Sequence, residues 1–348
     1  MEDLKYHRLR LADVIAETGD AHSLVFELPG DLLDRFTYKP GQFLTLRIPS
    51  SSGALARCYS LASSPHADDA LKVTVKRVND GAASNWICDN LKPGDEVEVL
   101  PPAGVFTPRS LDGNFLLFAG GSGITPVMSI VKSALLQGEG RIALIYANRD
   151  EKSVIFRGEL DALARRHPDR LTVVHWLETV QGLPSVELLA AAARPWADYE
   201  CFICGPGIFM DCTVEALHKL GVARECIHVE RFVSLAGDPL IEAEAAKTAF
   251  ATPSDGPVTR VEVFLDSKLY ELDWPADRHL LDVLLAEGID APHSCRMGSC
   301  SACMCQLEDG EVKLDKNTVL DKTDLAENWI LACQAIPLTD KVKVRFPT

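Results

Sequence analysis

The sequence has no apolar run long enough to cross a bilayer. No stretch approaches the roughly 20 consecutive apolar residues that a spanning helix needs. A signal-peptide pattern is also missing, because residues 1–7 show no charged head followed by an apolar run. From these two absences we expect a protein without a membrane span, located in the cytoplasm.

Positive charge is in short supply as well. The 35 Lys and Arg residues against 50 Asp and Glu residues give a formal net charge of −15, which argues against nucleic acid or an anionic membrane as a partner. We find no Ser-His-Asp or zinc-hydrolase pattern. The chain has 348 residues, and 47% of them are hydrophobic. This is enough for two or three domains with hydrophobic cores.

Cysteine is the residue that stands out. Eleven cysteines in a chain with no export signal predict reduced thiols, some of which bind metal. Four have the spacing C-x4-C-x2-C and then, after 29 residues, a fourth Cys, which is the ligand pattern of a plant-type [2Fe–2S] cluster. A zinc site would use two short ligand pairs, and only one is present. The predicted ligands are Cys295, Cys300, Cys303 and Cys333.

The loop that carries the first three of these cysteines consists mainly of short residues. Gly298 can take a positive φ, and Ser299 and Ala302 leave room for backbone N–H groups to approach the cluster sulfurs. Cys305 lies outside the spacing. If 304–307 is a strand, we expect its side chain to be structural.

Residues 1–108 contain several short stretches in which apolar and polar residues alternate, as they do in half-buried strands. Pro-Gly turn signals stand between some of them. Short strands at this spacing predict a small antiparallel barrel. The stretches are 25–28, 43–48, 71–78 and 95–100.

Two short motifs in this region suit a bound nucleotide. In 57–60, Arg-Cys-Tyr-Ser, the Arg can bind a phosphate, the Tyr can stack on a flat ring and the Ser can bond to a ring edge. In 81–84, Gly-Ala-Ala-Ser, a turn of small residues opens a helical stretch and suits a pyrophosphate. The alternative interpretation of this turn is an ordinary helix cap at Ser84.

Residues 109–236 alternate strand and helix patterns. A buried-strand run at 114–119 leads into 120–123, Gly-Gly-Ser-Gly, and then into a helix with Thr125 as expected N-cap and Pro126 as first helical residue. This order is that of a nucleotide-phosphate site. The G-x-G-x-x-G fingerprint is not matched, so a tight turn without a ligand is the alternative. Further alternation predicts a parallel sheet covered on both faces, with strands at 142–146, 171–176 and 200–204 and helices at 156–166 and 186–193.

The last region follows a linker, 237–258, whose Pro, Gly and small residues predict a tether with few contacts. Beyond it, 261–265 and 268–272 predict a hairpin, and 280–287 an amphipathic helix. Residues 259–348 hold 16 Asp and Glu against 10 Lys and Arg, a net charge of −6. The acidic charge of this region could therefore attract a basic partner, and salt would weaken that attraction.

Together these motifs resemble the ferredoxin–NADP reductase superfamily. The segments 40–43 (Pro-Gly-Gln-Phe), 57–60 and 81–84 are similar to its flavin-binding barrel, and the end of the chain is similar to a plant-type ferredoxin. The resemblance implies a multidomain fold. Its parts are an antiparallel β-barrel flavin domain at 1–108, an α/β nucleotide-binding domain with a parallel sheet at 109–236, the linker at 237–258 and an α+β β-grasp ferredoxin domain at 259–348.

The resemblance also implies roles for single residues. Arg57 would bind the flavin phosphate, Tyr59 would lie against the isoalloxazine, and Ser60 would lie near its N5 edge. Glu230 and Phe232 would lie near the flavin, and Cys204 beside the nicotinamide, so that Ser60, Cys204 and Glu230 are the catalytic candidates. A pyrophosphate site at Gly81, Ala82, Ala83 and Ser84 favours FAD over FMN. The nicotinamide nucleotide would contact Gly120, Gly121, Gly123, Thr125, Pro126, Cys204, Gly205 and Pro206.

In this family the order of modules implies an electron path from NAD(P)H through FAD and the [2Fe–2S] cluster to a separate iron oxygenase, of Rieske or another type. Arg149 leaves NADPH possible, but the acids Asp150 and Glu151 would repel a 2′-phosphate and favour NADH.

Among oxygenase reductase components, the chain resembles first those of 3-ketosteroid 9α-hydroxylases of steroid and cholesterol catabolism. The alternatives are the reductases of phenylacetyl-CoA epoxidases or aromatic-ring oxygenases, a stand-alone NAD(P)H flavin reductase or diaphorase, and a non-enzymatic redox sensor based on the cluster.

Overall fold

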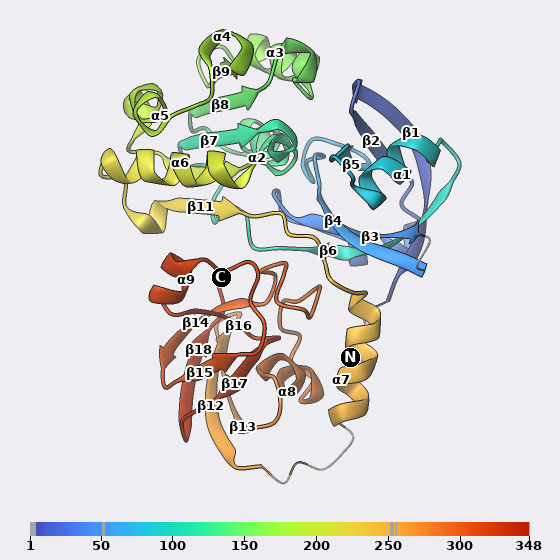
Figure 1. Ribbon diagram of the computed structural model, residues 1–348, viewed down its shortest axis with the longest axis vertical. Coiled ribbons are helices and arrows are strands. Elements are labelled where there is room, and N and C mark those ends of the chain that lie inside the picture. The colour runs from blue at the N-terminus through green and yellow to red at the C-terminus, as the bar shows by residue number, and fades with distance from the viewer. Residues whose placement is uncertain (1–4, 51–52, 251–253, 255, 348) are drawn as a thin grey trace.

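The computed structural model describes residues 5–50, 53–250, 254 and 256–347. They form three bodies with hydrophobic cores of their own. In Figure 1 the first two bodies lie side by side, and the third lies below both. Within the described ranges, no helix is long and apolar enough to cross a membrane.

The first body is a six-stranded antiparallel sheet in the order β4-β3-β6-β1-β2-β5. Leu61, directly after β4, pairs with Val73 of β5 and so joins the two edge strands, which closes the expected barrel. Sequence patterning missed β1. The elements are β1 (His7–Thr18), β2 (Ala21–Phe26), β3 (Phe43–Ser50), β4 (Gly53–Ser60), β5 (Leu71–Lys76), α1 (Ala82–Asn90) and β6 (Glu96–Ala103).

The second body is a five-stranded parallel sheet in the order β11-β10-β7-β8-β9, with helices on both faces (Figure 1). Its central strand β7 is buried along its whole length, which explains its continuous apolar run. The strands are β7 (Phe115–Gly120), β8 (Ile142–Asn148), β9 (Leu171–Leu177), β10 (Glu200–Cys204) and β11 (Ile227–Glu230). The helices are α2 (Ile124–Gln137), α3 (Arg157–Arg166), α4 (Glu178–Gln181), α5 (Val186–Ala193) and α6 (Gly207–Lys219).

Helix α2 begins two residues earlier than the sequence predicted. A short 3₁₀ segment, Gly121–Gly123, runs straight into it, so its N-cap is Gly123 and not Thr125. The Thr125 hydroxyl instead donates to the Ser122 carbonyl at 3.0 Å, and Pro126 is the third helical residue. The alternative interpretation of the 81–84 turn, a helix cap at Ser84, is also wrong, because the N-cap of α1 is Gly81.

The segment expected to be a tether with few contacts contains a helix, α7 (Pro239–Phe250). Its Ala- and Glu-rich stretch has high helix propensity, which outweighs the Pro and Gly residues near its ends. Phe250 packs against the core of the third body, and Asp238, just before α7, forms an ion pair with Arg47 of the barrel at 2.8 Å. Figure 1 shows α7 running beside α8.

The third body is a mixed five-stranded sheet in the order β13-β12-β18-β14-β16, with a two-stranded sheet of β15 and β17. The expected hairpin is present, and its turn residues Asp266 and Ser267 both have positive φ, as a type I′ turn requires. The elements are β12 (Val258–Leu265), β13 (Lys268–Pro275), α8 (Leu280–Ala286), β14 (Met304–Asp309), β15 (Val312–Leu314), α9 (Lys322–Ala326), β16 (Trp329–Leu331), β17 (Ala335–Pro337) and β18 (Lys341–Arg345).

Candidate redox site

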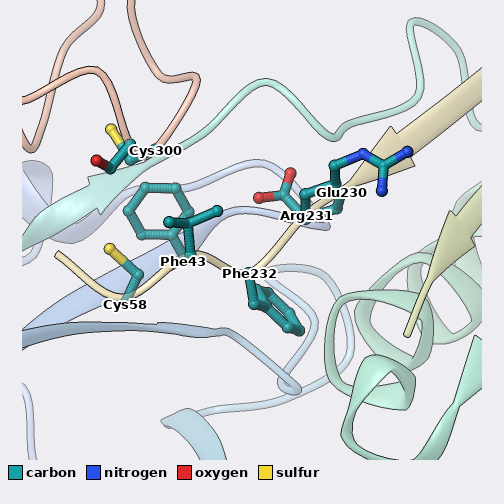
Figure 2. A pocket seen from close by; sticks show the side chains of 8 residues that line it. Phe43, Cys58, Glu230, Arg231, Phe232 and Cys300 are labelled. Carbon is teal, nitrogen blue, oxygen red and sulfur yellow. The ribbon is translucent and has the colours of Figure 1, made fainter. Parts of the chain in front are cut away.

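All three bodies contribute to the lining of one cleft. Its walls come from β3 and β4 of the barrel, from the end of β11 and the segment after it, and from the cysteine loop of the third body (Figure 2). In Figure 2 the Phe43 ring lies between the side chains of Cys58 and Cys300, and Phe232 points away from them. The lining residues are Phe43, Cys58, Glu230, Arg231, Phe232, Val233, Ser299 and Cys300.

Strand β4, whose Cys58 lines the cleft, also carries three predicted flavin contacts. Arg57 Nη1 donates to the carbonyls of Ala56 at 2.7 Å and of Leu235 at 3.1 Å. Burial raises the pKa of the Tyr59 phenol. Ser60 is buried, and its Oγ has no hydrogen-bond partner among the described residues. Because a buried hydroxyl without a partner is costly, this atom fits the edge of a bound flavin ring.

In the 81–84 turn, the backbone amides are more available to a ligand than the Ser84 hydroxyl is. Ser84 Oγ accepts a hydrogen bond from the Val78 amide at 3.2 Å and lies 3.5 Å from the Gly81 carbonyl, so it is used within the turn. The amides of Ala82 and Ala83 are in the first turn of α1, where N–H groups have no partner inside the helix. The turn therefore fits a pyrophosphate through its amides.

Two loops at the carboxyl end of the parallel sheet pack backbone to backbone. A Cβ at Gly123 would lie 2.1 Å from the Cys204 carbonyl oxygen, and one at Gly120 would lie 2.7 Å from Pro206 Cδ. A Cβ at Gly205 would lie 3.0 Å from Gly120 Cα. These glycines are therefore needed for loop packing, whereas a Cβ at Gly121, where φ is +53, would lie 3.5 Å from Lys76 Nζ, an ordinary contact. Close packing thus accounts for these glycines, and the two interpretations of the loop, a nucleotide-phosphate site and a tight turn without a ligand, stay open.

Cys204 and Glu230 are the last residues of neighbouring strands and lie opposite each other in the β10–β11 register. Both side chains are buried. Burial raises the pKa of Glu230 to about 8. Burial, with the charge of Glu230 as a second cause, also raises the pKa of Cys204 well above its usual range, so its thiol stays protonated at neutral pH. Phe232, two residues beyond Glu230, is 43% exposed.

At the end of β8, sequence reasoning missed Asn148. It is buried, and both atoms of its side-chain amide lack hydrogen-bond partners among the described residues. Its position as the last, polar residue of a buried strand is the signal that could have identified it. Arg149 forms an ion pair with Asp150 at 3.4 Å, and Asp150 caps the short helix that follows, so this acid has a structural role beside any effect on the nucleotide.

The four cysteines of the predicted cluster are brought together, and all are buried. The expected backbone approach is present: the amides of Met297 and Ser299 each donate to Cys295 Sγ at 3.4 Å. A hydrogen bond with the Cys300 thiol, together with these amides, lowers the pKa of Cys295 to about 7. Gly298 has φ +71, and a Cβ there would lie 2.6 Å from the Lys316 carbonyl oxygen, so the loop requires glycine.

These thiols form two pairs. Cys295 is hydrogen-bonded to Cys300, and Cys303 to Cys333. In the part of the chain that the structure describes, no group of three or more His, Cys, Asp or Glu side chains could hold a single metal ion. Two pairs of thiols fit a two-iron cluster, in which four thiolates are shared between two irons. Cys305 lies in β14 and is buried in the core, as expected of a structural residue.

Sequence reasoning also missed part of the cleft lining. Cys58 has a signal in the sequence, because it stands between Arg57 and Tyr59, and Phe43 stands in the 40–43 motif. The other three, Arg231, Val233 and Ser299, have no such signal, because they reach the cleft only through packing of the three bodies. The missed lining residues are Phe43, Cys58, Arg231, Val233 and Ser299.

Comparison with known proteins decides the family. Three family models match in succession: an oxidoreductase FAD-binding domain at 8–107, an oxidoreductase NAD-binding domain at 117–215 and a 2Fe-2S iron-sulfur cluster binding domain at 263–338. The chain is 55% identical over 97% of its length to the ferredoxin reductase component of 3-ketosteroid-9-alpha-monooxygenase from Rhodococcus rhodochrous, and the match covers 96% of that relative. The chain belongs to the ferredoxin reductase components of oxygenases.

The chain is also similar to more distant proteins. A component of 1,2-phenylacetyl-CoA epoxidase from Escherichia coli is 33% identical over 98% of each chain. Full-length CYP116B46 from Tepidiphilus thermophilus has a TM-score of 0.65 and 25% identity, over 97% of this chain and 42% of that one. Phthalate dioxygenase reductase shares the fold over 98% of both chains, with a TM-score of 0.57 and 22% identity.

Membership of this reductase family confirms several predictions made from the sequence. The chain is an NAD(P)H-dependent oxidoreductase with an FAD-binding domain, rather than an FMN domain, and with a [2Fe–2S] domain. The expected fold, a flavin barrel, a parallel α/β nucleotide domain and a ferredoxin domain, is confirmed as well. An oxygenase component follows as its electron acceptor.

Proposed function

We propose that this reductase passes electrons from NADH through FAD and the [2Fe–2S] cluster to the Rieske-type oxygenase component of a 3-ketosteroid 9α-hydroxylase. The observation that carries the proposal is the single cleft in which the flavin strands, the end of β11 and Cys300 of the cysteine loop meet. Relatives named for the 3-ketosteroid enzyme, at 51% to 55% identity, support the choice of substrate system.

On the flavin side, the proposal gives each residue a task. Arg57 would neutralise the flavin phosphate, and Tyr59 would cover the ring. Ser60 would donate its unpartnered hydroxyl to the ring edge. The amides of the 81–84 turn would hold the pyrophosphate. When bound, FAD accepts two electrons as a hydride, whereas the cluster carries one electron at a time.

On the nucleotide side, the two packed loops would form the floor of the nicotinamide site. Gly121 and the first turn of α2, with Thr125 and Pro126, would face the phosphates. Cys204, Gly205 and Pro206 would lie beside the nicotinamide, where the protonated Cys204 thiol is compact and uncharged. Glu230, buried at the same edge, can hold a proton near the flavin at neutral pH. Phe232 would shield the ring from water. NADH is the proposed donor.

In the ferredoxin domain, Cys295, Cys300, Cys303 and Cys333 are the proposed cluster ligands. The amides of the loop would then bond to the cluster sulfurs, a contact that tunes a reduction potential. We take 1–108, 109–236 and 259–348 as the domain limits, with 237–258 as the connection. Reduced thiols and a nicotinamide donor suit the cytoplasm, which is the proposed location.

Reconstitution tests the proposal. The purified reductase, NADH and a purified 3-ketosteroid 9α-hydroxylase oxygenase should together hydroxylate the steroid, and omission of the reductase should stop the reaction. A phenylacetyl-CoA epoxidase oxygenase, tested in parallel, should turn over at least about tenfold more slowly, a difference of about 1.4 kcal/mol. Equal or faster coupling to the epoxidase would reject the steroid system. NADH oxidation with ferricyanide but with neither oxygenase would indicate a stand-alone diaphorase.

A further inference from the structure

The ferredoxin domain also touches the nucleotide domain outside the cleft, at a contact that adjoins the cleft through Arg231. There the short helix α9 lies below β11 of the nucleotide domain (Figure 1). Asp321, Asp324 and Glu327 of the α9 region face Arg224 and Arg231. Neither arginine was selected from the sequence.

Arg224 is the centre of this contact. Its Nη1 donates to the Ile227 carbonyl at 2.6 Å, which fixes the guanidinium on its own domain. Its Nη2 then meets Asp324 Oδ1 at 3.0 Å, and its Nε lies 3.6 Å from Glu327 Oε1. One planar fork therefore joins two acids of the α9 region, Asp324 within the helix and Glu327 at its C-cap.

Helix α9 is in turn connected to the cysteine loop. Asp321, its N-cap, follows directly after the turn 317–320, which Asn317 closes by accepting the amides of Val319 and Leu320. Within this turn, Thr318 donates from its backbone amide to the Gly298 carbonyl at 3.1 Å, and its hydroxyl lies 2.9 Å from Ser299 Oγ. A displacement of α9 is thus transmitted to the loop that carries Cys295 and Cys300.

The cysteine loop is in contact with the flavin barrel on its other side. Cys295, Met297 and Cys300 share an apolar cluster with Phe43 and Ala56 of strands β3 and β4. An isolated surface ion pair contributes little, but the Asp324 side chain is only 19% exposed and the Arg224 side chain 29%. Arg224 is partly buried, pairs with two acids and donates a third bond to the Ile227 carbonyl of its own domain. It therefore limits the motion of α9 more than a long side chain paired in water would.

We infer that Arg224 is a positioning residue for electron transfer within the chain: its ion pairs with α9 hold the cysteine loop at its place on the flavin barrel. The inference rests on the electron route proposed above. Arg224 touches neither cofactor site, so its effect is confined to the step from flavin to cluster, and the step from NADH to flavin does not depend on it.

Stopped-flow and freeze-quench experiments on the full-length holoprotein test this inference. In Arg224→Gln, bleaching of the flavin by NADH should keep the parent rate. Appearance of the reduced-cluster EPR signal should slow by roughly fivefold, the factor that about 1 kcal/mol represents. In the parent, salt should slow cluster reduction because it screens the pairs, and the variant should respond less.

A matched control and a double variant make the test specific. Arg165→Gln breaks an ion pair of similar length, 2.8 Å to Asp161, that lies within the exposed helix α3, and it should change neither rate. Asp324→Asn should act like Arg224→Gln, and the double variant should be no slower than either single one. Arg224→Lys should recover part of the rate.

Three results would overturn the inference: a parent rate of cluster reduction in Arg224→Gln, equal slowing of flavin bleaching, or additive effects in the double variant. Failure of the electron route itself gives a different result, because the parent would then show no reduced-cluster signal after flavin bleaching.

Discussion

The flavin barrel meets its two neighbours in different ways. Toward the nucleotide domain, apolar contacts such as that of Phe106 with Phe202 are accompanied by buried hydrogen bonds: Ser129 Oγ donates to the Ser63 carbonyl at 2.6 Å, and the hydroxyls of Ser64 and Ser133 lie 2.8 Å apart. Toward the ferredoxin domain the contact is an apolar cluster around the cysteine loop. A single buried hydroxyl pair, Thr45 with Ser294 at 3.2 Å, accompanies it.

The difference matches the two transfers that cross these boundaries. Hydride transfer requires the two rings to be aligned closely, and directional hydrogen bonds fix such an alignment. Electron transfer forms no bond, so the second boundary has to bring the cofactors near each other and exclude water, which apolar packing achieves. The charged contacts around Arg224 join the ferredoxin domain to the nucleotide domain and are not part of this boundary.

The largest expected effect is at the ferredoxin boundary. Cys300→Ala removes a proposed iron ligand that lies in the cleft, so we expect loss of the cluster and of electron delivery to the oxygenase, with flavin reduction by NADH retained. Iron and acid-labile sulfide analysis, with stopped-flow absorbance, measures both. The control is Cys305→Ala, a buried cysteine outside the ligand set, which should keep its iron. Loss of flavin reduction in Cys300→Ala would mean that the two boundaries are not independent.

The reciprocal variant removes the flavin and leaves the cluster. Arg57→Ala deletes the proposed phosphate partner, and a charged hydrogen bond of this kind contributes about 1.5–3 kcal/mol to binding. We therefore expect FAD to be lost on gel filtration while the iron content stays at the parent value. Titration of the apoprotein with FAD gives the affinity. An unchanged affinity would show that Arg57 serves only its bonds to the carbonyls of Ala56 and Leu235.

Local patterns could be predicted from the sequence, and contacts between the bodies could not. The spacing of the four cysteines and the hairpin turn at Asp266 and Ser267 depend on neighbouring residues, and both are confirmed as structural features. The buried contacts of Lys132 with Asp68 and Glu159, and the position of Arg224 against α9, join residues far apart in sequence. No local pattern marks them.

Two local errors have physical causes. Helix α7 was missed because Pro and Gly near the ends of a segment indicate a linker, although Ala and Glu between them favour a helix. The start of α2 was placed too late because Thr125 is a good cap by type, whereas its hydroxyl is used inside the first turn. The same distinction holds for the site. Candidate residues in short motifs could be selected from the sequence, whereas most residues that line the cleft could not.

Glu230 lies where both boundaries meet, and it should make stability depend on pH. Burial raises its pKa from the ordinary value of 4.5 to about 8. Between these values the folded protein keeps a proton that the unfolded chain has lost, so stability should fall as the pH rises from about 4.5 to about 8, and should level off above that. The shift corresponds to an effect on the order of a few kcal/mol.

Urea unfolding of the parent and of Glu230→Gln at several pH values measures this effect. The variant should lack the component of the pH dependence that Glu230 contributes, so that its stability relative to the parent rises from pH 5 to pH 9. Parallel curves for the two proteins would show that the Glu230 carboxyl is ionised in the folded state.

At the nucleotide boundary, Lys132→Met should cost about 1–3 kcal/mol in free energy of unfolding. The lysine is buried, and its Nζ lies 2.7 Å from Asp68 and 3.1 Å from Glu159. Both acids are about one-third exposed, which lowers the penalty below that of a fully buried pair. Arg224→Gln, at the contact between the nucleotide and ferredoxin domains, should cost no more than about 1 kcal/mol. Equal costs in urea unfolding would contradict the expected difference between the buried contact of Lys132 and the partly exposed contact of Arg224.

The smallest effect comes from a matched pair of hydroxyl deletions, one at each boundary. Thr45→Val and Ser129→Ala each remove a buried hydrogen bond, and each should cost about 1 kcal/mol in urea unfolding. Their kinetic effects should differ. Because Ser129 lies on the boundary whose hydrogen bonds align the nucleotide domain, its loss should slow flavin reduction by NADH, whereas Thr45→Val should leave that rate unchanged. If both variants slowed flavin reduction equally, the ferredoxin boundary would also control the alignment for hydride transfer.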